Sequence, residues 1–157
     1  MSAPDVSVVV VHHRGRGHLL EALEGLEAAC ASLSAETILV DNTGGRPVEE
    51  VLRRHPTLRR VVAGGNVGFA RGCGLGAQAA RSPLLVFVND DATVASDAVG
   101  LLVQTLASSP ADVVAAAGRL VDRSGEKNDF SDGFLTFEPG KEYRSVDGMK
   151  VNLVEAA

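Results

Sequence analysis

The pattern of apolar and polar positions predicts five short strands separated by helices. Continuous apolar runs such as "VSVVVV" and "LLVFV" are typical of strands that are buried on both faces of a parallel sheet. The predicted strands cover residues 6–11, 36–42, 58–63, 84–88 and 112–118. Each run is short enough for a strand and too short for a helix that spans a domain.

The segments between these strands carry helical patterns. One apolar stripe repeats at spacings of four, three, four and three, as a helix requires, in Leu19, Leu23, Leu26, Cys30 and Leu33. Further helices are predicted over residues 48–55, toward Ala80, and over 96–109, where Ser96 or Asp97 is the expected N-cap. His55 stands in a charged helix, and we expect it to face solvent.

The alternation of strands and helices with short connections predicts an α/β domain. Its sheet is expected to be mostly parallel, with right-handed crossovers and helices on both faces. This domain is predicted to cover residues 1–118. Residues 119–157 are more polar and turn-rich, with one short strand in "GFLTFEPG" and a C-terminal β-hairpin around Asp147 and Gly148.

Composition limits the classes of function. With 157 residues, 45% of them hydrophobic and 22% charged, the chain can bury a core without metal or disulfide links. The net charge of −5 argues against nucleic acid as a partner, and an anionic ligand needs local cations or a metal. Cys30 and Cys73 lack metal or redox spacing, and residues 6–11 are too short for a membrane span, so we expect a cytoplasmic protein.

Polar residues follow the predicted strands, and in an open α/β sheet the carboxyl ends of the strands form the ligand site. The residues that should converge there are His12, His13, Arg14, Asp41, Asn42, Asn66, Asn89, Asp90 and Asp91. Turn formation and helix capping are the alternative roles for such residues. Two acid–amide pairs at the ends of separate strands favour a ligand site.

The acids among these residues suggest a divalent cation. Two like charges about 4 Å apart repel by roughly 4 kcal/mol at an effective dielectric near 20. Oxygen ligands favour Mg²⁺ or Mn²⁺, which would also hold a diphosphate. Because alternate positions of an extended segment face the same side, Asn89 and Asp91 can reach one metal–phosphate cluster while Asp90 faces elsewhere.

The glycine-rich segment "GGNVGFARGCGLG" allows three interpretations. Its glycines can let backbone N–H groups approach a phosphate or ribose, which is the interpretation we favour. A dinucleotide fingerprint should follow the first strand instead, and "HHRGRGHLLE" lacks that spacing. The glycines can also serve only to pack a helix tightly on the sheet.

Four segments together resemble the inverting family-2 glycosyltransferases of GT-A fold, with the closest likeness to the rhamnosyltransferase-like branch. They are "VSVVVVHHR", "TILVDN", "GGNVGFARGCGLGAQAARSPLL" and "VFVNDDA", and they occur in the family's order. The resemblance covers residues 6–118. It implies a Rossmann-like sheet and identifies this part as the N-terminal, nucleotide-sugar-binding half.

The resemblance also implies roles for individual residues. The segment from Val11 to Arg14 would wrap the base, and Asp41 would accept a hydrogen bond from the base imide. The implied donor-binding residues are Val11, His12, His13, Arg14, Asp41, Asn42, Asn66, Gly68, Arg71, Asn89 and Asp90. Asp91 and Asn89 would bind Mg²⁺ or Mn²⁺.

The chain departs from the family pattern in four places. One is Gly74, where the family commonly has an asparagine. His12, His13 and Arg14 stand where the family usually has Thr-Tyr-Asn, and the metal element reads Asn-Asp-Asp. The acidic motif that supplies the family's general base has no convincing counterpart in "YRSVDGMKVNLVEAA", so the catalytic base is unassigned.

The resemblance implies metal-assisted, inverting transfer from a UDP- or dTDP-linked sugar to a glycan or another hydroxyl acceptor, as in cell-wall or polysaccharide biosynthesis. A lipid-linked acceptor would bring the protein to the inner face of a membrane. A homodimer or a completing partner chain is open. The alternatives are a nucleotide-binding module without catalysis and, more remotely, an NAD-type oxidoreductase.

Overall fold

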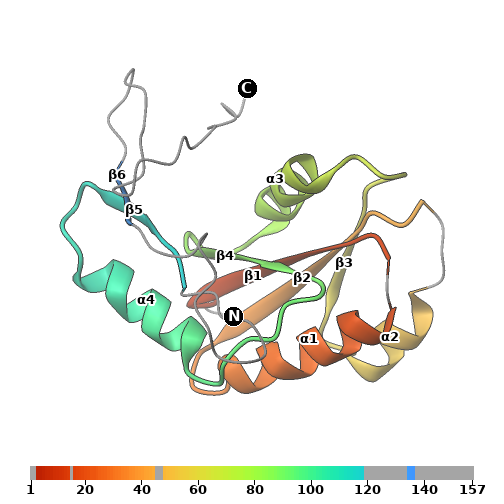
Figure 1. Ribbon diagram of the computed structural model, residues 1–157, viewed down its shortest axis with the longest axis horizontal. Helices are drawn as coiled ribbons and strands as arrows, with labels where there is room; N and C mark the ends of the chain where they lie inside the picture. The colour runs from red at the N-terminus through yellow and green to blue at the C-terminus, as the bar shows by residue number, and fades with distance from the viewer. Residues whose placement is uncertain (1–2, 15, 45–47, 119–133, 137–157) are drawn as a thin grey trace, which may run out of the picture. The chain divides into compact units, whose positions relative to one another are not determined.

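The computed structural model describes residues 3–14, 16–44, 48–118 and 134–136 (Figure 1). Contacts within the chain divide it after Val99 into two compact units, Met1–Val99 and Gly100–Ala157. The predicted boundary after Gly118 stays a prediction, and the expected C-terminal hairpin lies outside the described residues.

The first unit is built on a four-stranded parallel sheet with the order β3-β2-β1-β4. Its strands are β1 (Val6–His12), β2 (Ala35–Asp41), β3 (Arg59–Val62) and β4 (Leu85–Asn89). Its helices are α1 (Arg16–Ala29), α2 (Glu49–Arg54) and α3 (Phe69–Ala79). The predicted α/β class and the parallel sheet are therefore confirmed.

Helices cover both faces of this sheet, with α1 and α2 on one side and α3 on the other (Figure 1). Leu19, Leu23 and Leu26, from the predicted stripe of α1, are at most 2% exposed. The helix ends at Ala29, so the last two positions of the stripe lie beyond it. In α2, acids in the first turn and arginines in the last turn complement the helix dipole.

Helix α3 packs close to the sheet because two of its glycines face it. A Cβ atom on Gly76 would lie 2.2 Å from Val9 Cγ1, and one on Gly72 would lie 2.7 Å from Val11 Cγ1. Both glycines are buried. For this pair, the packing interpretation of the glycine-rich segment is the one that the structure supports.

The face under α3 is only partly covered. Four buried residues of β1 and β2 form its core: Val9, Val11, Ile38 and Val40. Phe87 pairs with Val9 and Leu85 with Ser7, so both belong to this face of β4. They are 46% and 36% exposed, respectively. The helix therefore covers β1 and β2 and leaves the edge strand β4 partly uncovered.

A buried carboxylate joins the amino ends of the strands. Glu36 accepts hydrogen bonds from Ser7 Oγ at 2.6 Å, from Arg59 at 2.6 Å and from the backbone and side chain of Arg81 at 2.6 and 2.9 Å. Burial raises the pKa of the Glu36 carboxyl, but these donors outweigh burial and lower the pKa to about 2. This cluster links β1, β2, β3 and the segment that enters β4.

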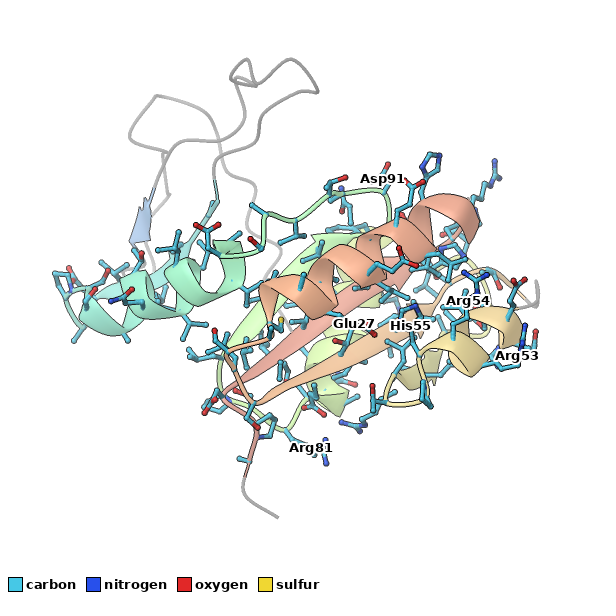
Figure 2. All side chains as sticks on the ribbon, turned by 90° about the horizontal axis from the view of Figure 1, so that it is seen from below. Glu27, Arg53, Arg54, His55, Arg81 and Asp91 are labelled. Atoms are coloured by element: carbon cyan, nitrogen blue, oxygen red, sulfur yellow. The ribbon has the colours of Figure 1, made fainter. Side chains whose placement is uncertain are left out.

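Two expectations need correction. The fifth predicted strand, β5 (Val113–Ala116), exists but pairs antiparallel with β6 (Phe134–Thr136) in a separate sheet. His55 is buried at 7% exposure rather than solvent-facing. Its Nδ1 lies 2.6 Å from Glu27 Oε1, and Figure 2 shows the two side chains side by side between α1 and α2.

The remaining helix is α4 (Ala98–Ser108), close to its predicted range. None of the helices in the part of the chain that the structure describes has the length and apolar character needed to span a bilayer.

Candidate functional site

The register of the sheet brings the predicted site residues to one edge. His12 is paired with Asp41 across β1 and β2, and Val11 is paired with Asn89 across β1 and β4. Because the strands are parallel and end together, the residues that follow them lie at the same edge. In Figure 2, Asp91, after β4, lies at the opposite end of the sheet from Arg81, before β4.

A histidine–carboxylate pair connects the ends of β1 and β4. His12 Nδ1 lies 2.6 Å from Asp90 Oδ2, and the His13 backbone N–H donates a longer bond of 3.4 Å to the same oxygen. His12 is 4% exposed, and the side chain of Asp90 is 20% exposed. Because an ionised carboxylate can only accept a hydrogen bond, the contact assigns the donor role to His12 Nδ1–H.

His13 is held in one orientation by its neighbours. Its Nδ1 donates to the backbone oxygen of Asn42 at 2.9 Å, because that oxygen can only accept. Its Nε2 then accepts from Arg14 Nε at 3.1 Å and faces Asn66 Nδ2 at 3.4 Å. These partners fix the neutral ring with the proton on Nδ1.

Asn42 orders the glycine-rich loop. Its side-chain oxygen accepts from the backbone N–H of Val67 at 2.8 Å, and its Nδ2 donates to Asn66 Oδ1 at 3.1 Å. The same Asn66 oxygen accepts from the backbone N–H of Gly68 at 3.1 Å. Gly68 has a φ of +84°, which favours glycine, and it immediately precedes α3. Asn42, Asn66 and Gly68 therefore belong to one connected network.

Asp41 is 2% exposed and its oxygens already have partners. Oδ1 accepts from the N–H and the hydroxyl of Thr43 at 3.1 and 2.7 Å, and Oδ2 accepts from Arg60 Nε at 3.0 Å and Arg60 Nη2 at 2.5 Å. Burial raises the pKa of the carboxyl, but these donors outweigh it and lower the pKa. A base contact at Asp41 would have to displace Thr43 or Arg60, so this contact stays a prediction.

Sequence reasoning did not identify Arg60 or Thr43 as partners of this site. The signal for Thr43 was available, since a hydroxyl two residues after an aspartate is typical of a local turn. Arg60 was harder to find. Arg60 reaches Asp41 because β3 pairs with β2. The sequence around Arg60 does not indicate which strand β3 pairs with.

The predicted metal-binding residues lie at the end of β4. Asn89 and Asp91 are both exposed, and Asp91 has no hydrogen bond or ion pair with the rest of the described chain. Among the residues that the structure describes, no three histidine, cysteine, aspartate or glutamate side chains form a metal-binding group. Arg71 is exposed on the first turns of α3.

This donor set fits a cation that is shared with a ligand. Mg²⁺ is commonly held by one or two protein carboxylates, with substrate phosphates and water completing the shell. Asp91 supplies one unengaged carboxylate, whereas Asp90 is engaged by His12. The side chains alone do not form a preorganised metal cage in this part of the chain.

The sequence and the fold were compared with those of known proteins. The family model described as Glycosyl transferase family 2 matches residues 7–151. The comparison with curated proteins gives no match.

Among solved structures, the chain is similar to the mannosyltransferase PcManGT from Pyrobaculum calidifontis, solved in complex with GDP-Man and Mn²⁺. The TM-score is 0.62 at 22% sequence identity, over 78% of this chain and 36% of that chain. This likeness shows the GT-A fold expected from the sequence. The chain thus corresponds to about a third of the length of that protein.

Proposed function

The chain belongs to glycosyl transferase family 2, and on this premise we propose that it binds a nucleotide-diphosphate sugar at the carboxyl ends of β1, β2 and β4 for transfer to a hydroxyl acceptor. The observation that supports this site most strongly is the connected polar network of His13, Asn42, Asn66 and Gly68. This network orders a loop at a solvent-facing edge of the sheet. The packing of the buried core does not require polar groups there, so a role in binding a ligand explains them better.

We propose that the segment from Val11 to Arg14 contacts the base. His13 is fixed in orientation and partly exposed, which suits a flat ring that meets a planar ligand. Asn66, Gly68 and Arg71 would lie along the ribose and the diphosphate, where Arg71 offers an exposed cation in a chain of net charge −5. UDP and dTDP are the expected nucleotides, and GDP belongs in the test because PcManGT was solved with GDP-Man.

Asp91, with Asn89 beside it, would hold Mg²⁺ or Mn²⁺ on the diphosphate. When bound, such a cation supplies neutralisation of the charge that develops on the departing nucleoside diphosphate. The structural neighbour was solved with Mn²⁺, which supports a divalent cation here. The protein's own contribution is to hold a carboxylate at the end of β4 without an internal partner.

Transfer with inversion requires three events at the sugar. The acceptor oxygen forms a bond to the anomeric carbon, the bond from that carbon to the diphosphate oxygen breaks, and the acceptor proton passes to a base. In this proposal Arg71 would stabilise the leaving diphosphate. We assign no base among the described residues, so donor binding and transfer are separate questions for this chain.

The acceptor is proposed to be a glycan or a lipid-linked glycan, as in cell-wall or polysaccharide biosynthesis. The same proposal includes transfer with inversion and membership of the rhamnosyltransferase-like branch. It also includes contact with the inner face of a membrane, and a homodimer or a completing partner chain. A nucleotide-binding module that catalyses nothing is the second candidate. It is favoured by the unassigned base.

Calorimetric titration of the protein with UDP, dTDP and GDP, each with and without Mn²⁺, tests the donor site. We expect one nucleotide to bind more tightly with metal, and Asp91→Ala to remove that gain. Asp97→Ala is the matched control, since it deletes an exposed carboxylate a short distance along the same segment. Absence of binding by all three nucleotides would overturn the donor site.

Release of UDP from a UDP-sugar in the presence of hydroxyl acceptors then separates the two candidates. Acceptor-dependent release supports the transferase. Tight binding without release supports the binding module. Tight binding of NAD without binding of any nucleoside diphosphate would favour the oxidoreductase instead.

A further inference from the structure

The turn after β4, which carries the proposed metal ligand Asp91, is held by a side-chain contact that the usual family sequence would not form. We infer that His12 is a positioning residue that fixes this turn through Asp90 and so orients Asp91 toward the donor diphosphate. This inference rests on the proposed function for its ligand, but its structural part concerns the protein alone. Where His12 stands, the family usually has a threonine.

The contact continues the pairing of β1 and β4 beyond its last backbone pair. That last pair is Val11 with Asn89. One residue further along each strand, the side chains take over, with His12 Nδ1 at 2.6 Å from Asp90 Oδ2. The His13 N–H adds a second donor to the same oxygen at 3.4 Å. The end of β4 is therefore attached to β1 by side chains where the sheet itself stops.

The two partners differ in their freedom to move. His12 belongs to β1, is 4% exposed, and its backbone oxygen accepts from the Asn42 N–H at 2.8 Å. Asp90 belongs to a turn, in which the Ala92 N–H donates to Asn89 O at 3.2 Å. The rigid member of the pair is the histidine, so it holds the aspartate and not the reverse.

Asp91 follows directly from Asp90 in this turn. It is exposed and makes no hydrogen bond or ion pair with the described chain that would orient it. Its direction is thus set by the backbone of the turn, which is held by one hydrogen bond inside the turn, by the short contact with His12 and by the longer bond from the His13 N–H. Loss of the His12 side chain leaves Asp90 with only the longer 3.4 Å bond from the His13 N–H, and the turn then samples more than one conformation.

Residues that orient a metal ligand typically change metal affinity by 10–100-fold when they are replaced. For His12→Leu we therefore expect the gain in nucleotide affinity on adding Mn²⁺ to fall by about tenfold. His12→Asn should keep most of the gain, because an amide Nδ2–H can take the place of the imidazole Nδ1–H.

His55→Leu provides the matched control. It removes a second buried histidine that has the same 2.6 Å contact to a carboxylate, but it does so between α1 and α2, away from the strand ends. It should leave the effect of Mn²⁺ unchanged, and urea unfolding of both variants measures how much stability each one loses. If His12 contributed to stability alone, His12→Leu would leave the gain in nucleotide affinity on adding Mn²⁺ unchanged, as His55→Leu does.

The test uses the full chain with UDP, dTDP and GDP as probes, and it reports the ratio of each Kd without and with Mn²⁺. Hydrogen exchange of the Ala92 amide in the metal-free protein gives a second readout. We expect exchange at Ala92 to become faster in His12→Leu and to remain slow in His12→Asn and His55→Leu.

If His12→Leu keeps both the Mn²⁺ ratio and the protection of Ala92, the inference is overturned. If the unsubstituted protein shows no Mn²⁺-dependent nucleotide binding, the proposed function fails and the link from His12 to the ligand fails with it. The exchange at Ala92 still decides, in that case, whether His12 holds the turn.

Discussion

Replacing Gly76 with alanine should destabilise the protein, although alanine is the better helix former. The new Cβ would lie 2.2 Å from Val9 Cγ1, 3.0 Å from Val9 Cγ2 and 3.2 Å from Val40 Cγ2. Carbon atoms in contact lie about 3.5–4.0 Å apart, so the new Cβ and Val9 Cγ1 would have to separate by about 1.3–1.8 Å. Val9 is fully buried and β-branched, which prevents it from turning away.

The magnitude follows from two opposing effects. Overpacking of a core costs about 1–3 kcal/mol. The exchange of glycine for alanine inside a helix contributes about 1 kcal/mol in the opposite direction. Gly74→Ala isolates the second effect, because Gly74 is exposed on the same helix and its Cβ would meet nothing within 4 Å. The difference between the two variants is then the overpacking cost itself.

Urea unfolding followed by far-ultraviolet circular dichroism measures this difference. We expect Gly74→Ala to be as stable as the unsubstituted protein or more stable. Gly76→Ala should be about 1–3 kcal/mol less stable than Gly74→Ala, which is a shift of about 1 M in the urea midpoint. Equal midpoints for the two variants would refute the reasoning, since α3 could not then lie as close to the sheet as its glycines indicate.

Three further predictions concern charges and the loop before α3. Because the pKa of Glu36 is lowered to about 2 in the folded state, its stabilisation is present above the unfolded value and is lost as the pH falls from about 4.5 toward 2. Glu36→Gln should therefore cost about 1–3 kcal/mol at pH 7 and progressively less as the pH falls. Glu24→Gln, the same change at an exposed position, should leave the urea midpoint unchanged at pH 7 and in acid. Arg60→Gln removes the guanidinium that pairs with Asp41, so we expect a loss of about 1–3 kcal/mol in thermal or urea unfolding, and an unchanged midpoint would show that the pair contributes nothing. Gly68→Ala meets no atom within 4 Å but keeps a φ of +84°, so a loss of about 1 kcal/mol is expected from backbone strain alone, and a stabilised variant would contradict this.

The sequence by itself determined the order of the elements and the class of the fold. Uninterrupted runs such as residues 6–11 report burial on both faces, and that local signal is sufficient to predict a parallel α/β sheet. It also located the candidate site, because a polar residue that follows a buried strand must lie at the edge of the sheet. His12, Asn42 and Asp90 were therefore identified before any pairing was known.

Tertiary structure decided which of these residues contact one another. That Asp90 binds His12, and that Asp41 binds Arg60, follows from the strand order β3-β2-β1-β4 and from the register of each pair. Neither the strand order nor the register can be predicted from the local sequence. The same holds for β5, whose apolar run predicts a strand but cannot state which strand it pairs with.

The burial of His55 and the role of Gly76 show the same division. A histidine at the end of a charged helix has the pattern of a surface residue, and only the neighbouring helix α1 covers it. A glycine in a helix is locally unfavourable, and only the distance to Val9 explains why it is there. Local patterns indicate whether a segment forms a helix or a strand and which of its residues tend to be buried. The residues that it packs against are distant in the sequence, and the packing of the helices and strands determines which they are.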